Sequence, residues 1–389
     1  MHIKINYDEI RSKAERLHIH ALHIVSLLLT LHLWLMIASL VYVSRGIHLI
    51  SVILVIWNYL MIWGLSFWVC VFSKRLRILK RIMIGSVIWI PVLHFFTAIY
   101  ICRLAKQEID HSLHKIALDD VRVENQICHT QYPILLVHGV GFRDLHYFNY
   151  WGRIPRELVR NGARVYYGHQ EAWGTVEDKG EALKHKIQEI MAETGSAKVN
   201  IIAHSKGGLD ARYLISGLDM KDCIASLTTI NTPHHGSKLV DLLKHLPDKI
   251  YRAICGQINR SFTHLGDVHP DAYHASYQLS YAYSLEFNRM YPDQEGIYYQ
   301  SYASLMKSGL SSKLLCIPYW ILKILDAPND GLVTVESATW THFRGVVRSK
   351  HLRGISHGDV IDLTREDYQG FDVIEFYVGI VKELKSMGL

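Results

Sequence analysis

Charged residues are missing from three long stretches near the start of this 389-residue chain. Residues 21–43, 47–72 and 82–102 contain no Lys, Arg, Asp or Glu. This absence excludes solvated loops, and three such runs in succession are hard to bury in an ordinary core. Each run is long enough to cross a bilayer core, which takes about 20 apolar residues in a helix. The sequence therefore predicts a membrane anchor over residues 1–103 with three transmembrane helices.

An excess of positive charge is missing from the rest of the chain. Residues 1–110 contain twelve Lys and Arg and five Asp and Glu, so their net charge is +7. Because the whole chain has a net charge of +6, residues 111–389 have a net charge of −1. The basic residues therefore belong to the anchor. A polyanion-binding role loses its main support, and we expect no nucleic-acid partner.

Several further signals are absent. The six cysteines lack the spacing of a metal site and cannot be paired into disulfides from the sequence. There are no internal repeats, so the three apolar runs do not resemble a transporter. The glycine-containing segment HGVGF lacks the GKS/T ending of a phosphate-binding loop.

The distribution of Lys and Arg predicts the orientation of the anchor. The N-terminal tail has four such residues, the segment 73–81 (SKRLRILKR) has five, and the turn at 44–46 has one. The tail and the segment 73–81 are therefore expected in the cytoplasm. With three crossings, the protein is a multi-pass cell-membrane protein whose catalytic domain is extracellular.

An alternating pattern of strands and helices begins after a linker at 104–130. Short apolar runs at 134–137, 164–167, 199–202, 224–230 and 297–303 read as strands. Amphipathic stretches at 152–161, 176–193 and 206–216 read as helices. This alternation predicts an α/β domain over residues 131–389, with a mostly parallel, doubly wound sheet. In such sheets the functional residues lie at the carboxyl ends of the strands.

The first functional segment is Ala203-His204-Ser205-Lys206-Gly207-Gly208. It follows a β-branched strand and opens a helix, which is the context of a nucleophile elbow. Ala203 takes the place of the usual first glycine and is small enough for the turn. A serine in an ordinary strand–helix turn is the alternative for this motif alone. Ser205 is the predicted nucleophile.

The second segment, His138-Gly139-Val140-Gly141-Phe142, directly follows the first strand. Acyl transfer passes through an oxyanion that fixed backbone N–H groups stabilise. We assign the donors to Val140 and to Lys206, the residue after the nucleophile.

The third segment pair supplies an acid and a base. Asp330 lies in the turn Asn329-Asp330-Gly331, and His357 follows a strand predicted near 346–348. The chain order Ser205, Asp330, His357 is that of an α/β-hydrolase. His342 and His351 are alternative bases, and Asp326 is an alternative acid.

Residues 131–385 resemble bacterial triacylglycerol lipases of the clostridial type, in the α/β-hydrolase superfamily. The matching segments are ILLVHGVGF, AHSKGGLDARY, NTPHHGS, NDGLV and SHGDVIDL. The resemblance covers about two-thirds of the 389 residues. It implies Ser205, Asp330 and His357 as the triad, with Val140 and Lys206 at the oxyanion hole.

The resemblance also raises the question of a structural calcium ion. Related lipases bind Ca²⁺ through an aspartate two residues after the catalytic histidine, and Asp359 stands there. Leu363 stands where a glutamine ligand is expected, and no aspartate precedes Asp330 at the usual distance. No cofactor is required by this chemistry, and we assign no metal ligand.

Two insertions are not needed by the sheet: a cap at about 238–296 and an apolar segment at about 304–328. An apolar cap suits an acyl chain. We therefore expect a membrane-anchored serine lipase or carboxylesterase acting on lipid esters, with a cap helix that opens at a lipid surface. A phospholipase or acyltransferase on the same fold, or a non-catalytic membrane-tethered binding domain, is the alternative.

Overall fold

The structure is a computed structural model that divides into two compact units, Met1–Val121 and Arg122–Leu389. It describes residues 7–44, 48–73, 76, 78–142, 150–325, 328–350, 353–365 and 370–389. All six cysteines lie in these ranges and are free thiols.

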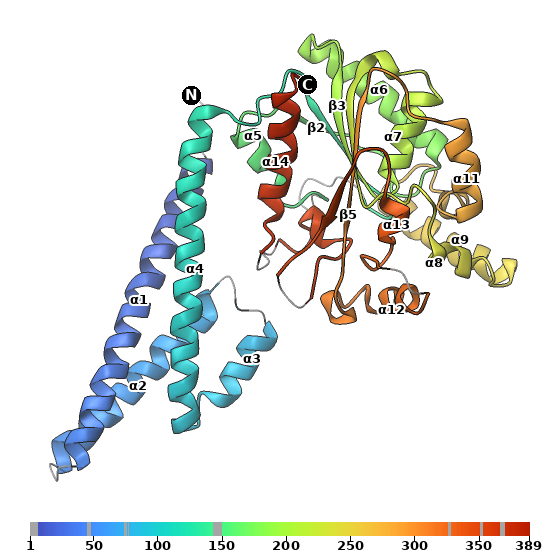
Figure 1. The fold of residues 1–389 in the computed structure, drawn as a ribbon. Coiled ribbons are helices and arrows are strands. Elements are labelled where there is room, and N and C mark those ends of the chain that lie inside the picture. Colours follow the sequence, from blue (N-terminus) through green and yellow to red (C-terminus); the bar gives the residue numbers. More distant parts are fainter. Residues whose placement is uncertain are drawn as a thin grey trace. The chain divides into compact units, whose positions relative to one another are not determined.

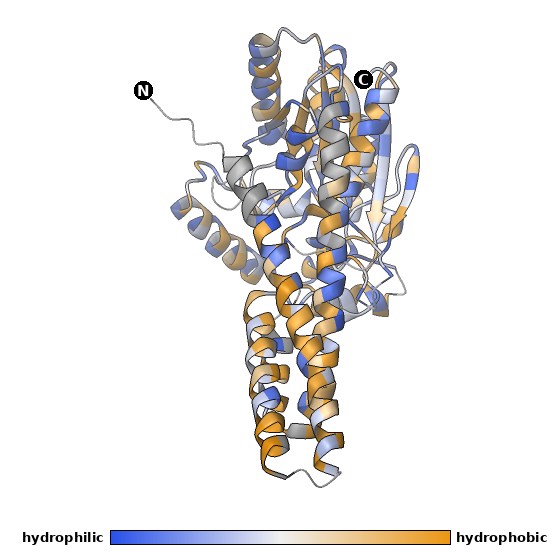
Figure 2. Ribbon diagram, turned by 90° about the vertical axis from the view of Figure 1, so that its left-hand side faces the viewer, coloured by the Kyte–Doolittle hydropathy of each residue, from blue (hydrophilic) through white to orange (hydrophobic). Residues whose placement is uncertain are grey.

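The N-terminal unit consists of four helices. They are α1 (Tyr7–Ser44), α2 (His48–Phe72), α3 (Ile78–Val87) and α4 (Pro91–Asn125). Two segments, Glu15–Ser44 and Val52–Phe72, are long and apolar enough to cross a membrane. Figure 2 shows that hydrophobic residues dominate much of this helical unit. These two segments coincide with the first and second predicted spans.

The third predicted span, 82–102, is not one helix. It is divided between α3 and α4 by a turn at residues 88–90. Pro91 is the first residue of α4, where its fixed φ suits a helix start and its missing N–H costs nothing. The prediction of three continuous membrane helices is therefore wrong in its third member, because the proline starts a new helix instead of bending one.

The predicted linker at 104–130 also differs from the structure. α4 continues without a break from Pro91 to Asn125, so most of the expected linker is helical. The stretch carries mixed charge, and its apolar periodicity is enough to prolong the helix beyond the apolar run.

The second unit is built on a six-stranded sheet with the strand order β2-β1-β3-β4-β5-β6. Every neighbouring pair of strands is parallel. The strands are β1 (Ile134–Val137), β2 (Val165–Tyr167), β3 (Val199–His204), β4 (Ile224–Ile230), β5 (Tyr298–Ser304) and β6 (Phe343–Val347). The predicted parallel sheet is confirmed, and its first five strands lie within two residues of the predicted ranges.

Helices cover both faces of the sheet, as Figure 1 shows. One core contains side chains of α5 (Ile154–Arg160) and α14 (Val373–Ser386), together with Trp151. The other contains side chains of α6 (Val176–Thr194) and α7 (Gly207–Ser216). Successive residues of β1 alternate between the two cores: Leu135 and Val137 lie in the second, and Ile134 and Leu136 in the first. The doubly wound arrangement is thereby confirmed.

The two insertions are helical. Between β4 and β5 lie α8 (Lys238–Leu243), α9 (Asp248–His264), α10 (Ala272–Tyr277) and α11 (Tyr281–Met290). Between β5 and Asp330 lie the 3₁₀ turn η2 (Gly309–Ser311) and α12 (Cys316–Ile324). The remaining short elements are η1 (Lys221–Cys223), α13 (Val335–Ala338) and η3 (Asp359–Ile361).

Candidate active site

Ser205 lies in the sharp turn between β3 and α7. Its φ is +56°, in the left-handed region that residues other than glycine rarely adopt. The helical side of the turn has no room for side chains. A Cβ on Gly207 would lie 2.5 Å from the His138 carbonyl oxygen, and one on Gly208 would lie 2.2 Å from Thr232 Oγ1. The strained serine and its small neighbours are the features of a nucleophile elbow.

His357 and Asp330 form a buried pair. Asp330 Oδ2 lies 2.6 Å from His357 Nδ1, and the backbone amide of His357 donates to the Asp330 carbonyl at 2.9 Å. The other carboxylate oxygen accepts the amides of Leu332 and Val333 at 2.9 and 2.8 Å. The carboxylate is thus held by three contacts from two loops, and the backbone bond adds a fourth link between them. It fixes the orientation of the imidazole and leaves Nε2 of His357 available to another group.

The histidine lies beside the elbow. The ring of His204, the residue before Ser205, has its centroid 4.4 Å from that of His357. Ser205 and His357 are 9% and 7% exposed, so both are nearly buried but not sealed. Ser205, His357 and Asp330 are therefore gathered at the carboxyl edge of the sheet.

The segment after β1 closes over the serine. A Cβ added to Gly139 would lie 2.7 Å from Ser205 Cβ and 3.2 Å from its Oγ. The amides on either side of Val140 are engaged: Gly139 donates to the Tyr150 hydroxyl and Gly141 to the Ala172 carbonyl. Within the described chain, the amides of Val140 and Lys206 donate to no other backbone group. Both remain available to an oxyanion.

The side chain of Lys206 forms a buried ion pair next to the elbow. Its ammonium lies 2.6 Å from Asp210 Oδ1, and both side chains are fully buried. A second buried ammonium, that of Lys179, lies 3.8 Å from the other oxygen of Asp210. Burial lowers the pKa of Lys179 to about 8. Lys206 is thus held at its backbone carbonyl, which accepts the Leu209 amide at 2.8 Å, and at its side chain.

Two arginine–aspartate pairs brace the loop that carries His357. Arg153 Nε and Nη2 donate to the two oxygens of Asp362, each at 2.8 Å. Arg353 Nη2 donates to both oxygens of Asp359 at 3.0 and 2.8 Å. The amide of Ser356 donates to the same carboxylate at 3.0 Å.

This geometry does not fit a calcium ion at Asp359. A calcium site takes six to eight oxygen ligands, whereas both Asp359 oxygens here accept hydrogen bonds from a guanidinium. The side chain of Leu363 offers no ligand atom. No group of three or more His, Cys, Asp or Glu suited to a metal occurs in the described part of the chain. The guanidinium of Arg353 thus provides a positive charge at the place where a calcium ion would lie.

The alternative site residues are placed as follows. His342 lies just before β6 with a φ of +47°, and its ring contacts that of Tyr298 at 5.9 Å. Among the described residues, no hydrogen bond or ring contact joins it to Asp330 or to the elbow. His351 and Asp326 lie outside the described residues.

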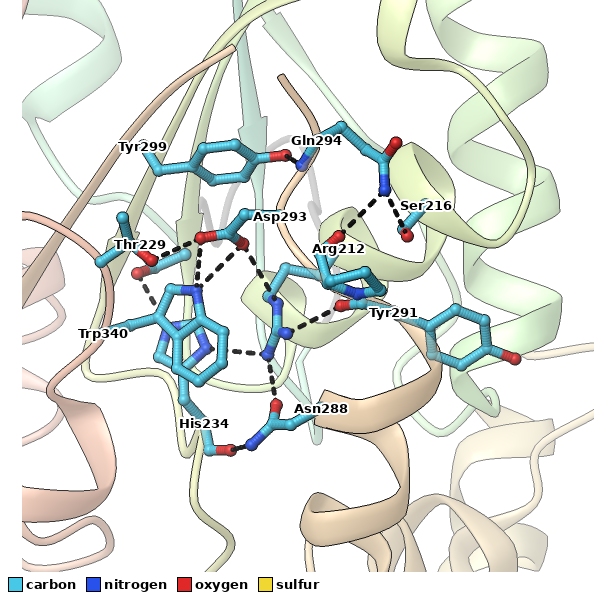
Figure 3. A network of polar contacts seen from close by, with 12 residues as sticks. Arg212, Ser216, Thr229, His234, Asn288, Tyr291, Asp293, Gln294, Tyr299 and Trp340 are labelled. Carbon is cyan, nitrogen blue, oxygen red and sulfur yellow. Dashed lines mark hydrogen bonds and ion pairs between the residues drawn. The ribbon is translucent and has the colours of Figure 1, made fainter. Parts of the chain in front are cut away.

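Sequence reasoning did not find the polar network around Arg212 of α7. The guanidinium is 2% exposed and lies 4.0 Å from the Trp340 ring centroid. It donates to Asn288 Oδ1 at 2.7 Å and to the Tyr291 carbonyl at 2.9 Å. Figure 3 shows these groups around it, with Asp293 and His234 completing the cluster. The network joins α11, the last cap helix, to α7. The sequence does not distinguish Arg212 from a surface arginine, because its partners are far away along the chain.

Comparison with known proteins gives several relatives across the second unit. The chain is 30% identical to a triacylglycerol lipase of Vibrio cholerae, over 67% of this chain and 89% of that protein. It is also 30% identical to a triacylglycerol lipase of Pseudomonas fragi, over 67% of this chain and 98% of that protein. The chain belongs to the lipases of the α/β-hydrolase superfamily. This lipase is accordingly a hydrolase of carboxylic ester bonds.

Other comparisons agree on the fold of this lipase. Triacylglycerol lipase 2 of Saccharomyces cerevisiae is 28% identical over 68% of this chain and 84% of its own. A metagenomic carboxyl esterase of known structure superposes with a TM-score of 0.51 at 15% identity, covering 66% of this chain and 76% of the esterase. No protein-family model matches the chain. The α/β-hydrolase fold predicted from the sequence is thus confirmed for the second unit.

Proposed function

We propose that this lipase hydrolyses lipid esters through an acyl-enzyme on Ser205, with His357 as general base and Asp330 as the acid that orients it. The observation that carries the proposal is the strained Ser205, at a φ of +56°, beside a histidine hydrogen-bonded to a buried carboxylate. A serine hydroxyl is a weak nucleophile, and an adjacent base activates it.

The chemistry follows from the position of each group. His357 accepts the proton of Ser205 Oγ as that oxygen bonds to the ester carbonyl carbon. The histidine then returns the proton to the alcohol oxygen as the ester C–O bond breaks. A water molecule attacks the acyl-enzyme by the same route, releasing the fatty acid and restoring the serine. Asp330 stabilises the imidazolium formed in each half of the cycle.

The amides of Val140 and Lys206 are the proposed oxyanion hole. Negative charge develops on the carbonyl oxygen in both half-reactions, and donors held in place stabilise it without reorganising. The tight approach of Gly139 to Ser205 and the buried Lys206–Asp210 pair support this assignment, since they fix the two segments that carry the donors.

The apolar surface of the insertions supports a lipid substrate. On and beside α12, Leu314, Ile317 and Ile324 are 81%, 74% and 81% exposed. α8, which contacts α12, exposes Leu242 and Leu243. Contiguous apolar surface of this kind marks an interaction site, and the curated relatives are named for triacylglycerol. A helix of this cap opens at a lipid surface. Equal activity on dissolved and aggregated esters would reject the opening.

The decisive experiment is hydrolysis of a chain-length series of p-nitrophenyl esters and of a triacylglycerol emulsion. Ser205→Ala is expected to abolish turnover, whereas Ser284→Ala, a buried cap serine, retains it. Long-chain preference supports a lipase, and activity confined to short esters indicates an esterase. Activity that survives Ser205→Ala would overturn the proposal. Fatty-acid release from phospholipids alone would indicate a phospholipase. Acyl transfer that needs an alcohol acceptor would indicate an acyltransferase.

α1 and α2 are the proposed membrane anchor. α1 has Arg11 and Lys13 ahead of the apolar segment Glu15–Ser44 and Arg16 at its start, and a basic flank of this kind favours the cytoplasmic side. Tethering keeps the site close to lipid. Resistance of the full chain to alkaline carbonate extraction tests the anchoring independently of catalysis.

A further inference from the structure

The third apolar run starts at the same level of the helical unit at which α2 ends. Arg81 of α3 donates to the carbonyls of Ser73 and Leu76, directly after α2. The Ser73 hydroxyl donates to Glu108 of α4 at 2.5 Å, and Glu108 also lies 3.3 Å from His18 of α1. These contacts place the start of α3, the end of α2 and one point on each of α1 and α4 at a common polar level.

The turn between α3 and α4 reaches only the middle of α2. The Tyr59 hydroxyl donates to the Trp89 carbonyl at 3.3 Å, and the Trp63 and Trp89 rings lie 5.1 Å apart. Tyr59 also contacts His94 at 5.0 Å. The part of α2 before Tyr59, from His48, continues for about 16 Å beyond this level at 1.5 Å per residue.

The length of α3 agrees with this depth. Its 10 residues span about 15 Å, and the part of α2 from Tyr59 to Phe72 spans about 20 Å, both short of a bilayer core of about 30 Å. α3 and α4 meet at this turn and diverge from it, as Figure 1 shows. Non-helical backbone at membrane depth needs partners within the protein. Here the amides of Ile88 and Ile90 donate to the Ile84 and Val87 carbonyls, and Tyr59 binds the Trp89 carbonyl.

The hairpin presents apolar side chains outward. Met83, Trp89, Val92 and Phe96 are 67%, 67%, 69% and 64% exposed. The exposed side chains of α4 become charged only at Arg103 and Lys106, next to the polar level of Glu108. This apolar surface, which ends at charged side chains, suits hydrocarbon bounded on one side by lipid headgroups.

We propose that α3 and α4 form a re-entrant hairpin that enters the membrane from one side and returns without crossing. The inference rests on the proposed anchoring by α1 and α2. The chain then leaves the membrane on the side of its N-terminal tail, so the catalytic unit shares that face and draws substrate from its leaflet. This replaces the extracellular catalytic domain that three crossings would give.

Reporter tags at the two ends of the full chain test the topology. An N-terminal and a C-terminal epitope tag are probed in sealed, oriented membrane vesicles with an impermeant protease, before and after detergent. The hairpin predicts that both tags are cleaved from the same face. Tags on opposite faces would establish a third crossing and overturn the proposal. A chain that carbonate extracts from the vesicles would overturn the hairpin and the anchor together, while leaving Ser205 chemistry unaffected.

A second inference concerns Tyr150, whose hydroxyl links the oxyanion segment to the histidine pair. It lies 2.6 Å from His204 Nδ1 and accepts the Gly139 amide at 3.2 Å. His204 in turn packs its ring 4.4 Å from that of His357. Tyr150 is 3% exposed and His204 is fully buried, so solvent does not compete for these bonds. Burial, with repulsion from His357, keeps the pKa of His204 well below its ordinary value, and the ring is neutral.

The geometry points to Tyr150 and His204 as positioning residues for the proposed hydrolysis. The hydroxyl fixes the turn that carries Val140, and the neutral ring of His204 supports His357 without repelling the imidazolium formed during reaction. Neither side chain is required to touch the substrate. Their loss should therefore lower kcat and leave KM nearly unchanged.

Tyr150→Phe keeps the ring and removes only the hydroxyl. A fall in kcat of about tenfold at constant KM is expected, less than the hundredfold or more for removing an oxyanion donor. Tyr377→Phe is the matched control, because that buried hydroxyl has no hydrogen-bond partner among the described residues and its ring lies 6.0 Å from Trp151. The control should retain the wild-type kcat.

The double variant Tyr150→Phe/His204→Gln separates positioning from general stability. If the hydroxyl acts through His204, the two losses are not additive, and the double variant is close to His204→Gln alone. Additive losses, or an unchanged kcat in Tyr150→Phe, would overturn the assignment. Persistence of activity in Ser205→Ala would instead reject the proposed function itself.

Discussion

The two units of this lipase use the same side chains in opposite ways. In the N-terminal unit, Leu17, Trp34 and Leu49 are 70%, 67% and 76% exposed. In the catalytic unit, Leu135, Leu136 and Ile201 are completely buried. Residue type alone therefore does not report burial, and the proposed membrane anchor would give the exposed apolar side chains of the first unit a hydrocarbon environment.

The two units resemble each other in how they bury polar groups. The helical unit pairs His32 with Asn58 at 2.8 Å. The catalytic unit pairs Lys206 with Asp210 and Arg353 with Asp359. A buried polar group needs a partner whatever solvent surrounds the unit. In the helices these pairs join one helix to the next, whereas in the catalytic unit they position reactive groups.

The largest expected effect confines the chemistry to the catalytic unit. Asp330→Asn should lower kcat about 10⁴-fold, because the amide holds His357 in the wrong tautomer. His342→Asn should retain wild-type activity, since that ring lies against Tyr298 instead. Steady-state hydrolysis of a p-nitrophenyl ester measures both variants. An active Asp330→Asn variant would mean that another acid orients the base.

A pair of leucine substitutions sharpens the contrast in burial. Leu136→Ala in β1 should lower the free energy of unfolding by about 2–5 kcal/mol, because it leaves a cavity in a closed core. Leu35→Ala in α1, where the side chain is 42% exposed, should change it by less than about 1 kcal/mol in detergent. Denaturant unfolding of the solubilised chain measures both. Equal losses would show that α1 is packed as an ordinary core helix.

The catalytic unit should lose stability in acid. Burial lowers the pKa of His138 to about 3 and holds the pKa values of His204 and His234 well below the ordinary 6.5. Below pH 6.5 the unfolded chain binds protons that the folded chain refuses. As the pH is lowered below 6.5, the free energy of unfolding should therefore fall by about 1.4 kcal/mol per pH unit for each such histidine.

Denaturant titrations from pH 7.5 to 4.5 measure this slope. His234→Gln should reduce it by about one proton's share, whereas replacing the exposed His245 by Gln should not. If the slope is unchanged in His234→Gln, that ring is protonated in the folded state.

The smallest expected effect is that of metal removal. Arg353 pairs with Asp359, the residue that the resemblance would make a calcium ligand, so EDTA should change neither the hydrolysis rate nor the melting temperature. Dialysis against EDTA followed by assay with and without added Ca²⁺ measures this. Loss of activity that calcium restores would show that the guanidinium does not replace the ion.

Much of the catalytic unit could be predicted because its signals are local. The strands are short apolar runs with turn residues at their ends, and the elbow is a six-residue motif. The assignment of the triad stays a prediction, although the structure brings its members to one edge. Tyr150 could not be found from the sequence, because its partner His204 lies 54 residues away and no motif links them.

The helical unit was harder to predict because where a helix ends depends on contacts with neighbouring helices. An apolar run containing Pro91 is compatible with a bent span or with two helices. The contacts of Trp89 with Tyr59 and Trp63 accompany the second outcome. In the catalytic unit, the pairing of Arg353 with Asp359 likewise could not be predicted, because the sequence does not show that the two side chains meet in space.

Ser205 as the activated nucleophile is the basis of the proposed mechanism, and covalent labelling of that serine tests it most directly. The detergent-solubilised chain is reacted with a fluorophosphonate, digested, and mapped by mass spectrometry, with Ser205→Ala and the matched Ser284→Ala alongside. A single adduct on Ser205 is expected, lost in the first variant and kept in the second. An adduct on any other residue, or none on an enzyme that is hydrolysing esters, would contradict it.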